Sequence, residues 1–252
     1  MKHCEACQSD TPLFAFTMAF QPIIDLHEKR IDAYEALVRS PDGGGAAGVL
    51  AQVTPENVYA FDQACRAKAI ELAAGLGMNR QLNINFLPNA IYDPRTCIRA
   101  TLDAAARTGF QPGRLTFEIV ESESISDTKH LLNIMSEYRR QGFKVALDDF
   151  GTGYSGLARL ADLKPDIVKI DRAVLQDCDK DPVRLAIVAS MIRLGAEIGV
   201  KMVLEGVERG GELEALRNVG ARFIQGFYFA RPMFEGIASD ADIFGSGKAG
   251  SQ

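Results

Sequence analysis

Short apolar segments alternate with longer segments of helical spacing over most of this chain, and this alternation restricts its fold more than any other feature. Six apolar segments are expected to be strands, over residues 81–85, 114–119, 144–148, 167–170, 201–204 and 221–225. Strands separated by helices in this way are typical of parallel βα units. We therefore expect an α/β protein built around a parallel sheet.

Two further strands are expected ahead of this region, over residues 14–24 and 31–38. Only the polar turn 25–30 joins them, and so short a connection can join only antiparallel neighbours. Eight strands in 252 residues match the size of one barrel. The sequence thus predicts a TIM-type (β/α)8 barrel with an antiparallel first strand over residues 14–244, flanked by a flexible tail, 1–13, and a polar tail, 245–252. An open doubly wound sheet is the alternative, but no GxGxxG sequence follows the early strands.

Several helices carry start and stop signals. Asp127 can cap a helix that Gly142 ends, and Asp181 with Pro182 can begin another that Gly199 ends. The residues expected on the buried side of the first helix are Leu131, Ile134, Met135 and Tyr138. Those expected on the buried side of the second are Ile187, Met191, Leu194 and Ile198.

The composition excludes several classes of protein. A formal net charge of −5 without a basic region makes long nucleic acids unexpected partners. No apolar window is long enough to cross a membrane, and the first residues lack the apolar stretch of a signal peptide. The five cysteines are scattered and fit reduced thiols, and the pair Cys4 and Cys7 is only half of a zinc site. We expect a cytoplasmic protein with no membrane segment.

Most of the expected strands also carry a polar side chain near one end. In a barrel, alternate side chains face inward, and catalytic groups lie at the carboxyl ends of the strands. This alternation places seven polar side chains at one mouth of the barrel, namely Glu35, Asn85, Glu118, Asp148, Lys169, Glu205 and Gln225. Each of them alone fits an ordinary surface or turn position, but their shared position favours a common site.

The segment KVALDDFGTGYSGL, residues 144–157, ends its strand with two adjacent carboxylates. Asp148 and Asp149 precede a glycine-rich turn, and alone the pair would favour an ordinary solvated turn. At a mouth with several other carboxylates, however, like charges repel one another unless cations lie between them. Because the set is rich in oxygen and contains no Cys or His, it predicts Mg²⁺ or Mn²⁺ as the ion.

Eight short motifs resemble those of a known family. They are QPIID (21–25), EALVR (35–39), NIN (83–85), EIVES (118–122), DDFGTGYSGL (148–157), KID (169–171), EGVE (205–208) and QGFYFARP (225–232). In this order they resemble the EAL-domain phosphodiesterases, which cleave the bacterial messenger cyclic di-GMP to linear pGpG. The resemblance covers residues 14–232.

The resemblance implies a role for each motif residue. One divalent ion would be held by Glu35, Asn85, Glu118 and Asp148, and a second by Asp148, Asp149 and Glu205. Lys169 would face the attacked phosphate and the water, Glu205 can accept a proton from that water, and Glu121 would stabilise the loop after Asp149. The residues assigned to the substrate or its bound waters are Gln21, Leu37, Arg39, Asp171, Glu208, Gln225 and Pro232. Ca²⁺ is expected to inhibit, because its loose coordination suits binding better than in-line attack.

The assembly and the activity each carry an expectation. Residues 150–163 resemble the region through which family members form dimers, so a homodimer is expected. Two alternatives to an enzyme remain, which are a non-catalytic receptor for cyclic di-GMP and a protein-binding regulator with the same fold.

Overall fold

The computed structural model of the chain describes residues 14–91, 93–120, 128–153 and 156–245. Glu121, Asp127, Cys4, Cys7 and the two tails beyond residues 14 and 245 lie outside the described residues. The strands are β1 (Thr17–Asp25), β2 (Arg30–Arg39), β3 (Gln81–Asn85), β4 (Leu115–Val120), β5 (Lys144–Phe150), β6 (Ile167–Ile170), β7 (Lys201–Leu204), β8 (Phe223–Ile224) and β9 (Met233–Phe234). The α-helices are α1 (Ala46–Leu50), α2 (Val58–Gly75), α3 (Pro94–Cys97), α4 (Arg99–Thr108), α5 (Thr128–Arg140), α6 (Gly156–Leu163), α7 (Arg172–Leu175), α8 (Pro182–Ile198), α9 (Gly210–Asn218) and α10 (Asp240–Phe244).

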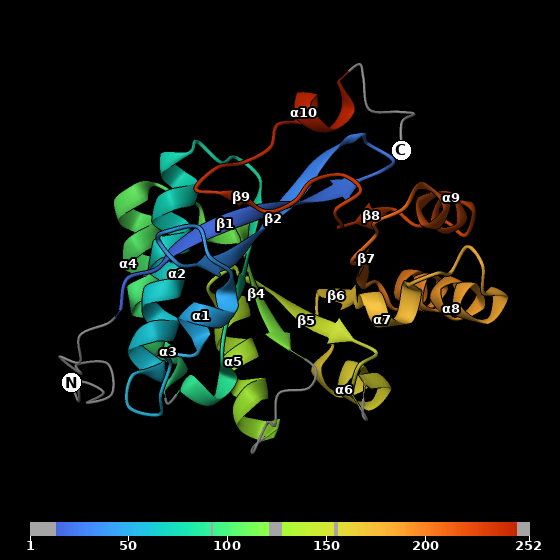
Figure 1. The fold of residues 1–252 in the computed structure, drawn as a ribbon. Coiled ribbons are helices and arrows are strands. Elements are labelled where there is room, and N and C mark those ends of the chain that lie inside the picture. The colour runs from blue at the N-terminus through green and yellow to red at the C-terminus, as the bar shows by residue number, and fades with distance from the viewer. Residues whose placement is uncertain (1–13, 92, 121–127, 154–155, 246–252) are drawn as a thin grey trace.

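The strands close into the predicted barrel, with helices around its outside (Figure 1). Strands β2 to β8 pair in parallel in chain order. Strand β1 runs antiparallel to both β2 and β8 and so closes the ring. The TIM-type barrel with an antiparallel first strand is therefore confirmed, and the open doubly wound alternative is wrong.

The short strand β9 is not predicted from the sequence. The two residues of β9 pair with β1, with Ala19 opposite Phe234 and Phe20 opposite Met233. Met233 and Phe234 are 42% and 45% exposed. A two-residue strand at a half-exposed edge shows no alternation of apolar and polar residues, so no sequence pattern could indicate it.

The apolar core has two parts, which lie on opposite faces of the barrel wall. Outward-facing side chains such as Phe20, Ile84 and Phe117 pack against the surrounding helices in one continuous cluster. The inward-facing side chains Ile23, Ala33, Ala146, Ile167 and Val203 form a second, smaller cluster, and Phe223 packs against it. We call these six residues the inner layer. Because the inner layer fills the barrel, the interior is a packed core and not a pore.

A buried ion pair joins three helices to the loop after β3. Arg66 of α2 lies 2.7 Å from an Asp62 oxygen and donates to Thr101 of α4 at 3.2 Å. Its guanidinium also lies 3.5 Å from the hydroxyl oxygen of Tyr138 in α5. The other Asp62 oxygen accepts from the backbone N–H of Leu87 at 3.1 Å. This network fixes the chain immediately after β3, and the last residue of β3 is the predicted site residue Asn85.

The predicted buried side is observed in full for α5 but only in part for α8. In α5 the predicted stripe is buried. In α8, Asp181 caps the first turn as predicted and accepts from Val183 and Arg184 N–H at 2.9 and 3.2 Å. The predicted buried side of α8 is wrong for Ile187 and Ile198, which are 43% and 48% exposed. Met191 and Leu194 are partly buried and pack against the core as predicted. The fully buried positions of α8 are Val188 and Gly195.

No helix among the described residues combines the length and the apolar character that crossing a membrane requires.

Candidate active site

The carboxyl ends of the strands bring the predicted polar side chains together above the inner layer. Glu35, Asp148 and Lys169 each stand two residues after an inner-layer residue on the same strand. Glu205 and Gln225 stand two residues after Val203 and Phe223, immediately past the ends of β7 and β8. In β1, which runs the other way, Gln21 stands two residues before Ile23. The alternation of side chains along each strand therefore places all six at the same mouth.

Lys169 lies at the centre of this group. Its side chain is 1% exposed, and its ammonium nitrogen lies 3.2 Å from Glu35, 3.0 Å from Glu118, 3.0 Å from Asp148 and 2.9 Å from Glu205. These four carboxylates come from β2, β4, β5 and the end of β7. A single buried cation therefore neutralises part of the charge of four acidic side chains.

The pKa values of these groups reflect their burial and mutual charge. Burial disfavours the charged form of Lys169, but Glu118, Glu205 and the other two carboxylates outweigh it and raise the Lys169 pKa well above its ordinary value. Burial raises the pKa of Glu118 and of Glu205 well above the ordinary value, against the opposing effect of Lys169. The site holds more negative charge than Lys169 alone balances, so it favours additional cations.

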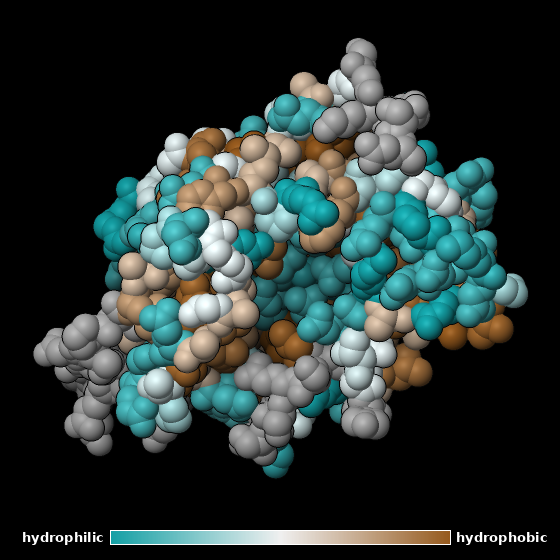
Figure 2. Space-filling model, in the orientation of Figure 1, coloured by the Kyte–Doolittle hydropathy of each residue, from teal (hydrophilic) through white to brown (hydrophobic). Residues whose placement is uncertain are grey.

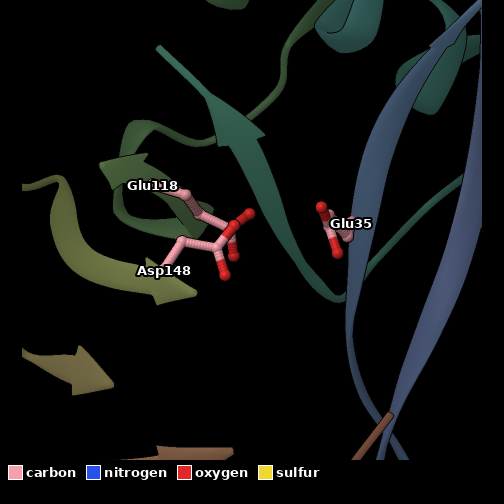
Figure 3. A group of neighbouring side chains, drawn as sticks. All are labelled: Glu35, Glu118 and Asp148. Carbon is pink, nitrogen blue, oxygen red and sulfur yellow. The ribbon is translucent and has the colours of Figure 1, made fainter. Parts of the chain in front are cut away.

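The carboxylates form two groups that share Asp148. Glu35, Glu118 and Asp148 each offer an oxygen within 4.8 Å of the others, and Figure 3 shows the three side chains directed toward one another from separate strands. Asp148, Asp149 and Glu205 form the second group by the same criterion. Hard divalent cations prefer such oxygen ligands, so the donor set fits Mg²⁺, Mn²⁺ or Ca²⁺.

Amide side chains hold the first group in place. Asn85 donates to one oxygen of Glu35 at 3.2 Å, and Gln225 donates to the other at 2.7 Å. Asn83 donates to Glu118 at 2.7 Å. The amide oxygens of Asn83 and Gln225 are buried and have no hydrogen-bond partner within the described parts of the chain. Buried polar atoms of this kind are uncommon and suit a site that completes its contacts with a ligand or water.

A local irregularity explains why two consecutive residues both face the mouth. Along a regular strand, Asp148 and Asp149 would point to opposite faces. Instead, the pairing of β5 with β6 shifts between Leu147 and Phe150, and Asp149 adopts a left-handed backbone with φ of 53°. Burial, followed by the charges of Asp148 and Asp171, raises the pKa of Asp149 to about 6. The bulge thus adds a carboxylate to the site that strict alternation would exclude.

A cavity of about 280 Å³ opens above the carboxylates. Figure 2 shows it as a hydrophilic hollow near the centre of that face. Five of the residues predicted to bind substrate line it, namely Gln21, Leu37, Asp171, Glu208 and Gln225. Arg39 and Pro232 do not line this cavity, and the Arg39 guanidinium donates to the Val38 carbonyl oxygen at 2.7 Å. Burial lowers the Arg39 pKa, against the opposing charge of Glu35.

Four further residues line the cavity without having been predicted as site residues, namely Arg172, Gly206, Gly226 and Phe227. Arg172 pairs with Glu208 at 3.0 Å and donates to the carbonyl oxygen of Gly206. A Cβ at Gly226 would lie 2.0 Å from the Val207 carbonyl oxygen, so only glycine fits there. Gly206 lies in the EGVE motif and Gly226 in the QGF motif. A glycine inside a motif is the sequence signal that could have indicated a close backbone approach at each position.

A third acidic group lies away from this mouth and is already neutralised. Asp177, Asp179 and Glu212 lie close together, but Arg209 bonds all three at 2.6 to 3.0 Å. This arrangement is a structural ion-pair network that fixes the start of α9.

A closed mixed barrel with a carboxylate-lined mouth defines a class of (β/α)8 proteins with an acidic site at the carboxyl ends of their strands. The chain belongs to the EAL domain family, whose model matches residues 8–232.

Several solved structures of EAL proteins are similar to this chain. A standalone versatile EAL protein from Vibrio cholerae O395, in its c-di-GMP bound form, is 46% identical, with a TM-score of 0.86, over 90% of this chain and 95% of that one. Klebsiella pneumoniae BlrP1, in a manganese/cy-diGMP complex at pH 9.0, is 35% identical, with a TM-score of 0.84, over 94% of this chain and 59% of that one. Structures of this family are thus known with the nucleotide and with a divalent metal.

Curated relatives differ in their described activities. The blue light- and temperature-regulated antirepressor BluF of Escherichia coli is 27% identical over 95% of this chain and 60% of its own length. The bifunctional diguanylate cyclase/cyclic di-GMP phosphodiesterase MucR of Pseudomonas aeruginosa is 33% identical over 69% of this chain and 25% of its own length. The chain therefore spans less than two thirds of the length of these relatives.

Proposed function

We propose that this chain hydrolyses cyclic di-GMP to linear pGpG with the help of two divalent cations. The observation that carries the proposal is the pair of carboxylate groups that share Asp148 at the mouth of the barrel. The family membership and the phosphodiesterase among the relatives support it. We take residues 14–244 as the catalytic unit.

The proposed ligands follow from the two carboxylate groups. Glu35, Glu118 and Asp148, with the amide of Asn85, would hold one ion, and Asp148, Asp149 and Glu205 the other. When bound, such ions acidify a water and neutralise charge on the attacked phosphodiester. We propose Mg²⁺ or Mn²⁺ as the active ions and Ca²⁺ as an inhibitor, because Ca²⁺ coordinates more loosely.

Two side chains of the mouth would take part in the chemistry directly. Glu205, at 15% side-chain exposure, borders the cavity and can accept a proton from the attacking water. Lys169 keeps its proton at all physiological pH values, because four carboxylates surround it. It therefore supplies a fixed positive charge where negative charge develops on the phosphate.

The remaining predicted residues would bind the substrate or support the site. Gln21, Leu37, Asp171, Glu208 and Gln225 line the cavity and would contact the nucleotide or its bound waters. Arg39 is proposed to grip a phosphate oxygen bidentately, through guanidinium N–H groups that its hydrogen bond to the Val38 carbonyl does not use. Pro232 is proposed to contact the nucleotide, and Glu121 to stabilise the loop after Asp149.

One incubation tests the proposal against its alternatives. The purified chain is incubated with cyclic di-GMP and Mg²⁺, and the products are separated by chromatography after protein removal. We expect linear pGpG, and we expect EDTA to abolish its formation and added Mg²⁺ or Mn²⁺ to restore it. Bound but uncleaved nucleotide would instead identify a receptor, and no interaction at all would favour the protein-binding regulator.

We also propose that the chain forms a homodimer through α6 and α8. Leu157 on α6 is 60% exposed and Ile198 on α8 is 48% exposed, and both line an apolar groove of about 430 Å³. Exposed apolar side chains gathered in this way favour a protein contact. Light scattering should give the mass of a dimer for the parent chain and of a monomer for Leu157→Glu, whereas Leu132→Glu on α5 should remain dimeric. A monomeric parent chain would contradict the proposal.

The cellular compartment is also a proposal. Cys65, Cys97 and Cys178 are free thiols, which fits the reducing cytoplasm.

A further inference from the structure

The amino-terminal end of the barrel, opposite the carboxylate mouth, has a pocket of its own. It has a volume of about 280 Å³ and is lined by Arg30, Asp32, Asn79, Arg80, Gln81, Arg114, Lys144 and Lys201. Five of these eight residues are cationic and only Asp32 is acidic. Each of them stands within two residues of the first residue of a strand, from β2, β3, β4, β5 and β7. The barrel therefore gathers positive charge from five strands around one concave surface, in a chain whose formal net charge is −5.

The nearby carboxylates do not balance these cations. Asp32 is shared by Lys201, which contacts it directly, and by Arg30 at 4.0 Å. Asp240 pairs with Arg80 at 2.9 Å. Arg114 and Lys144 have no carboxylate partner among the residues that the structure describes. Five cations facing two carboxylates leave an excess of three positive charges.

Two of the cations are held in position by their neighbours. Lys201 is 23% exposed, and its ammonium nitrogen lies 3.9 Å from the centre of the Phe223 ring. With the Gln81 amide oriented to match its surroundings, its oxygen accepts from Lys144 at 3.3 Å and its nitrogen donates to the Arg114 carbonyl oxygen at 2.8 Å. The cations are thus partly ordered before any ligand arrives, which lowers the entropy lost on binding.

The charge of the pocket acts on its own residues. Burial lowers the pKa of Lys201, and the positive charge of Lys144 lowers it further, against the attraction of Asp32. Asp25, which also attracts Lys201, is bound by Arg222 at 2.8 Å. An anion placed between these cations would relieve their mutual repulsion.

We propose that this pocket binds a small polyanion that carries a diphosphate group. Three arginines can each present a fork of N–H donors to phosphate oxygens, and the two lysines add point charges. A diphosphate carries enough charge to match an excess of three, whereas a carboxylate carries one. The inner layer, which Phe223 joins, separates this pocket from the carboxylate mouth, so the two sites are distinct. The proposal does not rest on the hydrolysis of cyclic di-GMP.

Calorimetric titration with inorganic pyrophosphate tests the proposal, in EDTA and at constant ionic strength. We expect saturable binding of one pyrophosphate per chain, weakened about tenfold or more in Arg114→Gln/Lys144→Gln. The matched control, Arg193→Gln/Arg217→Gln, removes two exposed cations of α8 and α9 and should bind as the parent does. Asp148→Asn should also bind as the parent does, because it alters only the opposite mouth.

A second arm separates the possible sources of the diphosphate group. GDP is titrated beside pyrophosphate, and tighter binding of GDP would assign the site to a nucleotide, whereas equal or weaker binding would assign it to the inorganic ion. Both outcomes support the proposal that the pocket binds a diphosphate group. Absence of saturable binding, or equal weakening in the control pair, would overturn it. Unchanged melting temperatures of the variants would confirm that they are folded.

Discussion

Lys169 is the residue on which the candidate active site depends most. A buried ammonium within 3.2 Å of four carboxylates acts as an internal counter-ion when no metal is bound. The same charge would assist catalysis at the phosphate. Lys169 therefore has two roles that can be separated by measuring stability and turnover in one variant.

Replacing Lys169 with methionine keeps an unbranched side chain that is only one atom shorter and removes its charge. We expect Lys169→Met to lose turnover and, without metal, to be destabilised by about 3–5 kcal/mol, because buried carboxylates lose their partner. Added Mg²⁺ should raise the melting temperature of the variant more than that of the parent, since the ion replaces the lost charge. Lys68→Met on α2 should change neither property. A variant as stable as the parent without metal would contradict the counter-ion role.

Sequence reasoning found most of the site residues but not their contacts. Strand alternation placed Glu35, Glu118 and Glu205 at one mouth, because the pleat of a strand is set by the backbone alone. It could not place Asp149 there, because a bulge overrides the alternation. Arg172 was missed because it enters the cavity from the first position of α7, a four-residue helix that is too short to show a periodic pattern.

At the scale of elements, strands were easier to predict than helix faces. Successive side chains of a strand point to opposite faces, so the alternation of apolar and polar residues identifies both the buried and the exposed face. Apolar residues occur all around α8 between its few polar ones, and the pattern alone could not distinguish the buried side. The buried side is set instead by close packing at Gly195, where an added Cβ would lie 2.4 Å from a Met202 side-chain carbon and 2.9 Å from the Val200 carbonyl oxygen.

This packing yields a prediction that opposes helix propensity. Gly195→Ala should destabilise the chain by roughly 1–3 kcal/mol through overpacking, although alanine is the better helix former. The matched control is Gly75→Ala in α2, where an added Cβ has nothing within 4 Å. That control should be neutral or slightly stabilising. Urea denaturation of the two variants gives the comparison, and equal effects would show that the approach of α8 to β7 is not tight.

At the scale of the whole molecule, the barrel closes where β1 meets β8. Asp25 at the end of β1 is buried and bonds the Arg222 side chain at 2.8 to 3.1 Å. Burial would raise the Asp25 pKa, but the hydrogen bond from Arg222 and those from the backbone N–H groups outweigh it. The pKa of Asp25 therefore lies below its usual value of 3.8.

A lowered carboxyl pKa fixes the sign of the pH dependence. The stabilisation by Asp25 is fully present above the pKa of the unfolded chain, about 4, and is lost as the pH falls through the lower folded pKa. We expect Asp25→Asn to be less stable than the parent by roughly 2 kcal/mol at pH 7. The difference should shrink as the pH falls below about 4. A difference that stays constant down to pH 2 would show that the charge of Asp25 does not stabilise the closure.

The global architecture was accessible from the sequence because the strand order follows the chain order. Each parallel pair joins successive strands, so no long-range rearrangement had to be guessed. The edge strand β9 and the basic pocket at the amino-terminal end were not accessible. The first is too short for a pattern, and the second is built from residues spread between positions 30 and 201 that only the closed barrel brings together.

The rate of cyclic di-GMP hydrolysis by Asp148→Asn, compared with the parent chain at saturating Mg²⁺, tests the central claim most directly. Asp148 belongs to both carboxylate groups, and asparagine keeps its shape while removing the charge that the two ions would share. We expect turnover to fall by at least about a thousandfold, with an unchanged fold by circular dichroism. Hydrolysis near the parent rate in a folded Asp148→Asn would contradict the claim that two ions share this carboxylate.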